Sequence, residues 1–290
     1  MQLQEAIQHL WLSTAQNHEQ DLLEKYKQRK PVNKASFVIK TTLILLFLLT
    51  IYSFFTFDYK DINLLEAIKD TLINFRTMFT EAHFKNFSFL AGLHKISFTL
   101  GIAFLATITG GVLAFFLGLF SAQNLSSKGV SNVIKGFVSF VRAVPTVLWV
   151  LIFAVSIGLG TTAAVVGLTF HSFGYLLKAF SESFEELDHG VIEALTACGA
   201  NWWQIVFQAV VPSSISYLLA WTFIRFEINF VEAVAVGAAA GAGGIGFELF
   251  MASARYFNLR EVGAITYLIL IIALILEITS SKLKTRLFKK

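Results

Sequence analysis

The sequence contains little cysteine, little proline and little charge. It has one cysteine and three prolines, and the single cysteine, Cys198, excludes a disulfide framework. Charged residues make up 14% of the chain, well below the roughly 25% found in soluble domains. Hydrophobic residues make up 56%. This balance excludes an ordinary soluble domain and predicts an all-α integral membrane protein whose charges are confined to its loops and ends.

Several signatures of other protein classes are also missing. No Gly-x4-Gly-Lys-Ser/Thr pattern occurs, so the chain is not expected to hydrolyse ATP. No clustered pattern of histidines and carboxylates suggests a metal site, and we predict no metal, catalytic group or cofactor in this chain. The net charge of +4 does not indicate nucleic acid, because the basic residues cluster beside apolar spans, which is typical of topology control. No cleavable signal is visible in the polar N-terminal segment.

Six apolar segments are predicted to cross the membrane, since ~20 residues span the hydrocarbon layer. They lie near 41–57, 96–120, 137–157, 162–180, 213–236 and 262–280. The third and fourth are separated at residues 158–162, and Pro212 marks the expected start of the fifth, because proline suits the first turn of a helix.

The spans divide the chain into four expected parts. Residues 1–36 form a cytoplasmic N-terminal segment, either a surface amphipathic helix or a loosely ordered tail. Residues 37–92 hold the first span and an external amphipathic segment. Residues 93–281 form the core, with a loop at 182–212, and residues 282–290 form a basic tail. Basic clusters at 25–34 and 282–290 flank the first and last spans, so both termini and the loop 182–212 are predicted to be cytoplasmic.

Residues 193–212 carry the most specific pattern in the chain. Glu193 and Ala194 begin it, Gly199 stands at its seventh position and Pro212 at its twentieth. This spacing resembles the cytoplasmic EAA loop of bacterial ABC importer permeases, where two short helices joined at a glycine bind a cytoplasmic ATPase. The alternative is a chance match in an alanine-rich helix.

The fifth span contains three polar residues near its middle: Arg225, Glu227 and Asn229. A charge there costs ~2.5–3.5 kcal/mol on insertion scales and needs a partner or a bundle interior. Arg225 and Glu227 are two residues apart, so they are expected to face different directions and to find partners elsewhere. Two interpretations remain open. The three residues line a translocation pathway, with Arg225 serving an anionic solute, or they form a clamp between helices.

A glycine-rich run follows the fifth span. Gly241, Gly243, Gly244 and Gly246 stand within six residues, which is unfavourable for a continuous helix. We interpret the run as a re-entrant segment or gate, against the alternative of a small-residue packing face. Near the third span, Arg142 and Pro145 are predicted to support the coupling side, with Arg142 at the interface and Pro145 producing a kink or a first turn.

These features together resemble the permease subunit of phosphonate-type ABC importers, within the type I importer class. The matching segments are 142–145, 193–212, 227–229 and 241–246. The resemblance implies a type I permease fold with about six membrane helices in a bacterial inner membrane. It also implies a second permease subunit, identical or related, a cytoplasmic ATPase dimer carrying ATP and Mg, and an external solute-binding protein delivering phosphonate, phosphite or a related oxyanion.

One departure bears on the solute. The family often has a basic residue two positions after the Asn, where this chain has Val231 followed by Glu232. A type I permease for another small solute, such as an amino acid or another oxyanion, therefore stays an alternative. A membrane-embedded enzyme would need clustered catalytic acids or histidines, and a transporter without ATP would be favoured by an inverted repeat. Neither pattern occurs.

Overall fold

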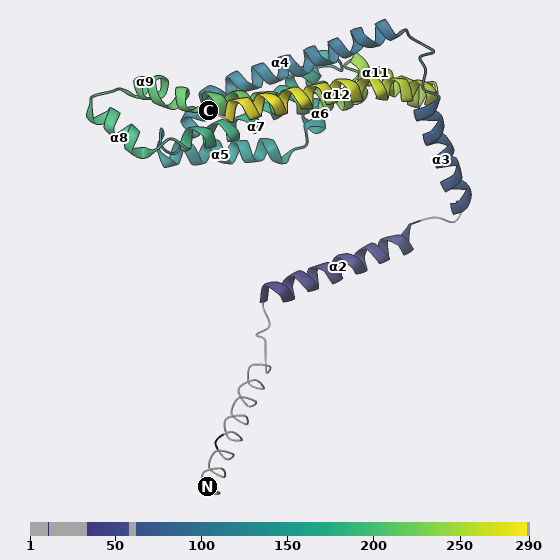
Figure 1. The fold of residues 1–290 in the computed structure, drawn as a ribbon, viewed down its shortest axis with the longest axis horizontal. Coiled ribbons are helices and arrows are strands. Elements are labelled where there is room, and N and C mark those ends of the chain that lie inside the picture. Colours follow the sequence, from purple (N-terminus) through teal and green to yellow (C-terminus); the bar gives the residue numbers. More distant parts are fainter. Residues whose placement is uncertain (1–10, 12–33, 58–61, 289–290) are drawn as a thin grey trace, which may run out of the picture. The chain divides into compact units, whose positions relative to one another are not determined.

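The computed structural model describes residue 11 and residues 34–57 and 62–288, and throughout these ranges the regular structure is helical (Figure 1). Most of the predicted N-terminal segment 1–36 and the last two residues of the basic tail lie outside the described residues. The elements are α2 (Lys34–Thr56), α3 (Leu64–Thr80), α4 (Phe89–Ser121), α5 (Lys128–Ala143), α6 (Thr146–Ile157), α7 (Thr161–Glu185), α8 (His189–Ala197), α9 (Trp202–Ile205), η1 (Val206–Val210), α10 (Val211–Ala239), α11 (Gly244–Phe250), η2 (Met251–Arg255) and α12 (Leu259–Phe288). The chain divides into two compact units, residues 1–67 and 68–290.

Helix α2 belongs to the first unit and has the properties of a lipid-facing span. Its 23 residues are predominantly apolar and none is buried. At 1.5 Å per residue the helix is ~35 Å long, enough to cross a hydrocarbon layer of ~30 Å. The hydroxyls of Thr42, Thr50 and Ser53 each donate to the carbonyl four residues earlier, so these polar groups are satisfied within the helix. Such internal bonding is what a lipid environment demands.

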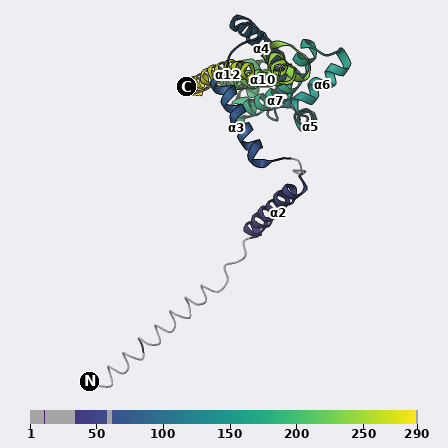
Figure 2. The same ribbon diagram turned by 90° about the vertical axis from the view of Figure 1, so that its right-hand side faces the viewer.

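Helices α4 and α7 form the most extensive helix pair of the second unit (Figures 1 and 2). Small residues allow their backbones to approach closely. A Cβ added to Gly110 of α4 would lie 2.9 Å from Cβ of Ser172 and 3.0 Å from the backbone nitrogen of Phe173. Because lipid tails are as apolar as a protein interior, membrane helices associate through such close packing rather than through a hydrophobic driving force.

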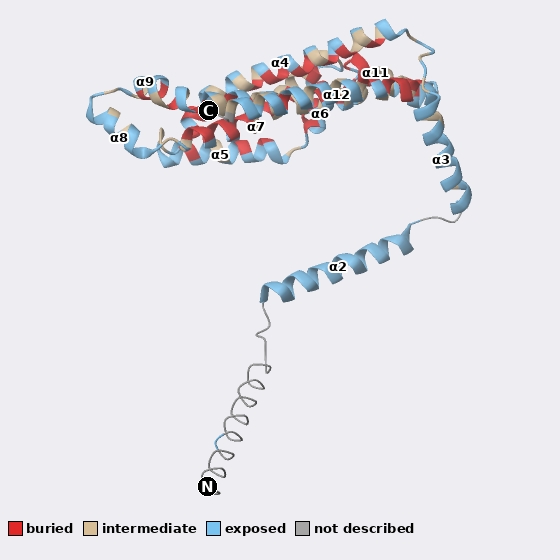
Figure 3. Cartoon of the chain, in the orientation of Figure 1, coloured by how far each residue is buried: buried red, intermediate tan, exposed pale blue. Residues whose placement is uncertain are grey.

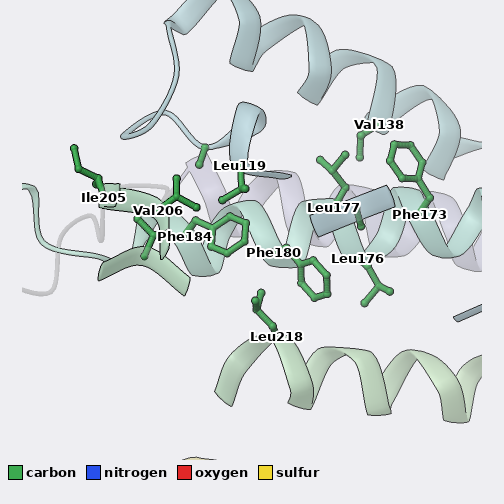
Figure 4. Packing of buried hydrophobic residues seen from close by; sticks show 13 residues of the cluster. Leu119, Val138, Phe173, Leu176, Leu177, Phe180, Phe184, Ile205, Val206 and Leu218 are labelled. Carbon is green, nitrogen blue, oxygen red and sulfur yellow. The ribbon is translucent and has the colours of Figure 1, made fainter. Parts of the chain in front are cut away.

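An apolar cluster fills one end of this bundle, around the second half of α7 (Figure 4). Phe180 and Phe184 of α7 are buried there against Leu119 of α4 and Val206 of η1, with Leu218 of α10 on the opposite side. Figure 3 shows the buried residues gathered where α4, α5 and α7 face one another. The cluster holds the start of the loop 182–212 on a rigid base.

The third predicted span, 137–157, is not a single straight helix. Helices α5 and α6 meet at a bend of 89°. The cause is local: Pro145 disfavours the helical conformation of the preceding Val144, which adopts φ −87° and ψ 122°. The Trp149 indole donates a hydrogen bond of 2.9 Å to the Val141 carbonyl across the bend. The prediction of six spans therefore holds only if this bent pair counts as one, beside five continuous apolar helices.

The fifth span begins earlier than predicted. Helical backbone is continuous from Trp202 to Ala239, so Pro212 does not begin a separate helix. It does lie in the first turn of α10, directly after the π-helical η1. The N–H of Val211 bonds to the carbonyl of Val206, five residues back. This one-residue change of register allows a proline to follow without ending the helix, as π-bulges do.

Residues 68–92 pack with the core rather than standing apart from it. The backbone N–H groups of Lys85 and Asn86 donate to Oε1 of Glu261 at 3.2 and 2.7 Å. Arg260 forms an ion pair of 2.6 Å with Glu81. The predicted external segment thus contacts the beginning of α12, and residues 68–290 form one compact unit.

Candidate functional site

The loop between α7 and α10 projects from one end of the bundle and carries the predicted coupling residues (Figure 1). Its first helix, α8, is capped by Asp188, whose carboxylate accepts from the N–H of Gly190 at 2.8 Å. No residue of α8 is buried (Figure 3). Only Ile192 and Leu195 are partly buried against the apolar cluster. The rest of the helix surface is therefore open to another molecule.

Gly199 ends α8 in a Schellman motif. Its own N–H donates to the Thr196 carbonyl at 2.9 Å, and the N–H of Ala200 donates to the Leu195 carbonyl at 3.0 Å. Gly199 has φ +84°, a left-handed conformation that costs other residues ~1–2 kcal/mol. A Cβ added there would have no neighbour within 4 Å in the described chain. The glycine is thus required by the turn, and the space beside it is open.

The second helix of the loop starts with a capping box and is anchored to the bundle. The Asn201 side chain accepts from the N–H of Gln204, and the Gln204 side chain accepts from the N–H of Asn201. Trp202 stacks on Phe120 at 5.4 Å between ring centroids, and its indole donates to the Leu125 carbonyl at 2.9 Å. The α8–α9 turn is therefore held by local caps and one aromatic anchor.

The predicted coupling residues are all exposed. Glu193, Ala194 and Gly199 are exposed on α8 and its turn, and Pro212 is exposed at the start of α10. Glu193 makes no hydrogen bond or ion pair with any residue that the structure describes. The residues chosen from spacing alone thus present free surface, as a docking helix requires.

The polar residues of α10 form a buried network with its neighbours. Arg225 is 2% exposed. Its Nη2 lies 2.8 Å from Oε2 of Glu232, and its Nε donates to Oγ of Ser172 at 3.1 Å. Its guanidinium also lies over the ring of Tyr175, 5.4 Å from the centroid. Arg225 therefore joins α10 to α7.

Asn229 extends the network to α4. Its Nδ2 lies 2.7 Å from Oγ1 of Thr107 and 2.8 Å from Oγ of Ser172. Glu232 in turn accepts from the Thr146 hydroxyl of α6 at 3.1 Å. One continuous network thus connects α4, α6, α7 and α10.

The sequence predicts that Arg225 finds a partner elsewhere; its Nε does bond to Ser172 of α7, but its charged partner lies on its own helix. Its partner is Glu232 on the same helix, seven residues later and therefore two turns away on the same face. Sequence reasoning flagged Glu232 only as a departure from the family pattern, although the seven-residue spacing was a usable signal. Glu227 behaves differently: it is half-buried and has no polar partner within the described chain. The structure brings Arg225 and Asn229 together and leaves Glu227 outside their network.

The glycine run ends α10 and turns the chain so that α11 packs back on it. Gly241, Gly243 and Gly244 all have positive φ, which explains why the turn uses glycine. A Cβ at Gly246 would overlap the Val234 carbonyl oxygen of α10. The run therefore combines a chain break with close backbone packing.

The predicted support residues lie at the break between α5 and α6 and just before it. Pro145 stands at the bend, and Arg142 lies exposed in the last turn of α5. Arg142 lines a cavity of about 250 Å³ that also reaches Glu182 and Glu185 at the end of α7, directly before the loop. Within residues 34–57 and 62–288, no group of three His, Cys, Asp or Glu residues is arranged to hold a metal ion.

Comparison with known proteins identifies the family. Residues 114–289 match the model of the binding-protein-dependent transport system inner membrane component. The phosphate-import permease protein PhnE of Mycolicibacterium smegmatis is 33% identical over 190 residues, covering 65% of this chain and 35% of that protein. The phosphite transport system permease protein PtxC of Stutzerimonas stutzeri is 32% identical over 187 residues, covering 64% of this chain and 67% of that protein.

A solved structure of the MetNI methionine ABC transporter shares the fold, with a TM-score of 0.59 at 20% identity, covering 68% of this chain and 95% of that chain. The match spans about a third of the mycobacterial relative and about two thirds of the phosphite permease. The all-helical bundle, its apolar spans and the family match agree with one another. This chain is a multi-pass membrane protein of the binding-protein-dependent transport system inner membrane component family, a transport subunit with the type I ABC importer permease fold.

Proposed function

We propose that this chain is the permease subunit of an ATP-driven importer for phosphonate, phosphite or a related phosphorus oxyanion. The observation that carries the proposal is α8, a capped helix with no buried residue, ended by Gly199 in a Schellman motif and held out from one end of the bundle. A nine-residue helix is too short to be stable alone in water. Its exposed surface is best explained by docking to an ATPase, which would bind ATP and Mg.

The arrangement of the bundle supports the proposed topology. The carboxyl end of α12 lies at the same end of the bundle as α8 and α9 (Figure 1). The C-terminal basic cluster and the coupling loop would therefore share one side, which the positive-inside rule makes cytoplasmic. We place the protein in a bacterial inner membrane with both termini inside. Its partners in this proposal are an ATPase dimer, a second permease subunit of identical or related sequence, and an external binding protein.

The solute class rests on relatives and on motifs. Relatives that share 33% and 32% identity are named for phosphate and phosphite. The segments 227–229 and 241–246 carry the pattern that resembles the phosphonate branch. The methionine permease MetI of Pasteurella multocida is 27% identical over 201 residues. That relative makes methionine the control solute in any test of specificity.

The paired state of Arg225 bears on its proposed role. Glu232 neutralises its charge at 2.8 Å, so the pair offers an anion little net positive field. We therefore assign Arg225 and Asn229 to a clamp between helices, and a pathway role for Arg225 requires Glu232 to release it during transport. Glu227, half-buried and without a polar partner among described residues, is the better pathway residue. The segment 241–246, which turns α11 back on α10, is our proposed gate.

The coupling assignment is tested by substituting Gly199 with two residues of different size. Gly199→Ala and Gly199→Trp share the cost of a left-handed conformation, ~1–2 kcal/mol, but differ in bulk. Since no atom of the described chain lies within 4 Å of an added Cβ, the space beside Gly199 is open, and an indole there would obstruct a docked partner. We expect both variants to insert in the membrane, the alanine variant to co-purify with the ATPase, and the tryptophan variant to lose the ATPase and transport.

Normal assembly and uptake by Gly199→Trp would overturn the coupling assignment. The solute class has a separate test, uptake of labelled phosphite, methylphosphonate and methionine by cells expressing the complete transporter. We expect uptake of the two phosphorus oxyanions and none of methionine. Uptake of methionine alone would replace the oxyanion class while leaving the coupling assignment intact.

A further inference from the structure

A cavity of about 250 Å³ lies between the end of α4, the middle of α5 and the second half of α7. It is separate from the exposed surface of α8 and from the Arg225 network. Ligand pockets for drug-sized molecules measure about 300–1,000 Å³, so this cavity is suited to something smaller. Its walls carry charged and hydroxyl groups beside the apolar side chains of Val138 and Leu177.

Two hydroxyls in this cavity have no hydrogen-bond partner. Ser121 of α4 and Ser181 of α7 are 0% and 1% exposed, and neither Oγ finds a partner within the described chain. Serine hydroxyls in membrane helices usually bond to a carbonyl three or four residues earlier, as Ser183 does at 2.8 Å. A buried hydroxyl without a partner is costly, and each such group calls for an explanation. Both serines belong to the lining of the same cavity, where a ligand could supply the missing partner.

The charges of the cavity favour an anion. Three basic residues line it: Lys135, Arg142 and Lys178. Two acidic residues also line it, and each is engaged: Glu185 accepts from Lys135 at 2.8 Å, and Glu182 lies 3.5 Å from Lys178. Glu185 Oε1 also accepts from the backbone N–H of Gln123.

Arg142 is the remaining cation. Among the residues that the structure describes it has no carboxylate partner, and its planar guanidinium suits a tetrahedral oxyanion.

We propose that this cavity binds a phosphate-type oxyanion, with Arg142 supplying the charge and the hydroxyls of Ser121 and Ser181 donating to its oxygens. Two sources share this chemistry: a free phosphorus oxyanion, and the phosphate of a lipid headgroup. The free-anion source deepens the proposed function, since the site stands at the end of the bundle where the solute would leave. The binding itself does not depend on coupling to an ATPase.

The test measures binding to the full-length chain purified in detergent. The thermal unfolding midpoint is followed by tryptophan fluorescence with sodium phosphite, sodium phosphate or phosphatidylglycerol. Sodium chloride at equal ionic strength and phosphatidylcholine serve as references. Three chains are compared: the parent, Arg142→Gln and Ser181→Ala. Lys128→Gln is the matched control, because Lys128 is an exposed cation on the same helix outside the cavity.

We expect an oxyanion to raise the midpoint of the parent and of Lys128→Gln. In Arg142→Gln the concentration needed for half of this shift should rise about tenfold or more, since a charge-assisted hydrogen bond is lost. Ser181→Ala should reduce the shift while leaving the midpoint without anion equal to or above that of the parent, because it removes an unpartnered hydroxyl. If either variant fails to fold, Lys178→Gln gives the same comparison through a half-exposed side chain.

The outcomes separate the sources. A shift with phosphite or phosphate assigns the site to a free anion, and a shift with phosphatidylglycerol alone assigns it to a headgroup. The proposal is overturned if no probe exceeds its reference, or if Arg142→Gln and Ser181→Ala respond as the parent does. Absence of anion binding in a parent chain with intact ATP-coupled uptake would refute this site alone, and normal uptake by Gly199→Trp with intact anion binding would refute only the coupling assignment.

Discussion

Replacing Glu232 with glutamine isolates the contribution of the buried ion pair. The substitution keeps the size of the side chain but leaves the guanidinium of Arg225, 2% exposed, without a counter-charge. Removing one partner of a buried pair costs about 3–5 kcal/mol, because the remaining charge is stranded away from water. Reversible unfolding in mixed detergent micelles, followed by tryptophan fluorescence, measures this loss.

The matched control is Glu81→Gln. Glu81 pairs with Arg260, and the side chains of Arg260 and Glu81 are 51% and 44% exposed. Losing this exposed ion pair should therefore lower the free energy of unfolding by at most about 1 kcal/mol. If Glu232→Gln costs no more than Glu81→Gln, the ion pair does not hold the helices and the clamp assignment fails.

A double variant separates the clamp from the pathway. Replacing both partners with apolar residues, Arg225→Met with Glu232→Leu, should restore most of the lost stability, since substituting a whole buried pair is often neutral or stabilising. A stable double variant with normal uptake confines the pair to a structural role. A stable, assembled double variant without uptake would return Arg225 to the pathway.

Two further predictions concern packing and topology. Gly246→Ala should destabilise the bundle by about 1–3 kcal/mol, because its Cβ would overlap the Val234 carbonyl oxygen and α11 would have to shift. Gly101→Ala, with no neighbour within 4 Å, should be neutral or stabilising in the same unfolding assay, and equal losses for both would contradict this reasoning. In a Cys198→Ala background, single cysteines at residues 30, 75 and 288 should report topology in intact cells, with only residue 75 labelled from outside; external labelling at residue 288 would break the six-span topology.

The class of the protein could be predicted from the sequence, because the signals involved are local or linear. A low charge content and long apolar runs require a membrane environment whatever the tertiary packing. The spacing of Gly199 predicted a turn, since the Schellman motif depends only on residues within one turn of helix. These features do not depend on which helices become neighbours.

Contacts between distant residues could not be read in this way. Pro145 explains why the helix breaks at Val144, but its presence alone does not give the 89° angle between α5 and α6. The continuity of the helix through Pro212 depends on the π-helical register of the preceding residues. Proline restricts the local backbone, but the surrounding packing decides how large the resulting bend becomes.

The polar groups show the same division. Sequence reasoning found Arg225 and Asn229 because a charge or amide within an apolar span is conspicuous. Ser172, the partner of Arg225, is 53 residues away in the sequence, and Thr107, the partner of Asn229, is 122 residues away. A serine or threonine in a helix is not by itself a signal of such a contact. The hydroxyls of Ser121 and Ser181 became notable only once α4 and α7 were seen to enclose them without a partner. Hydropathy determined the membrane class and residue spacing determined the turn at Gly199, and tertiary packing decided which polar groups meet and where a cavity remains.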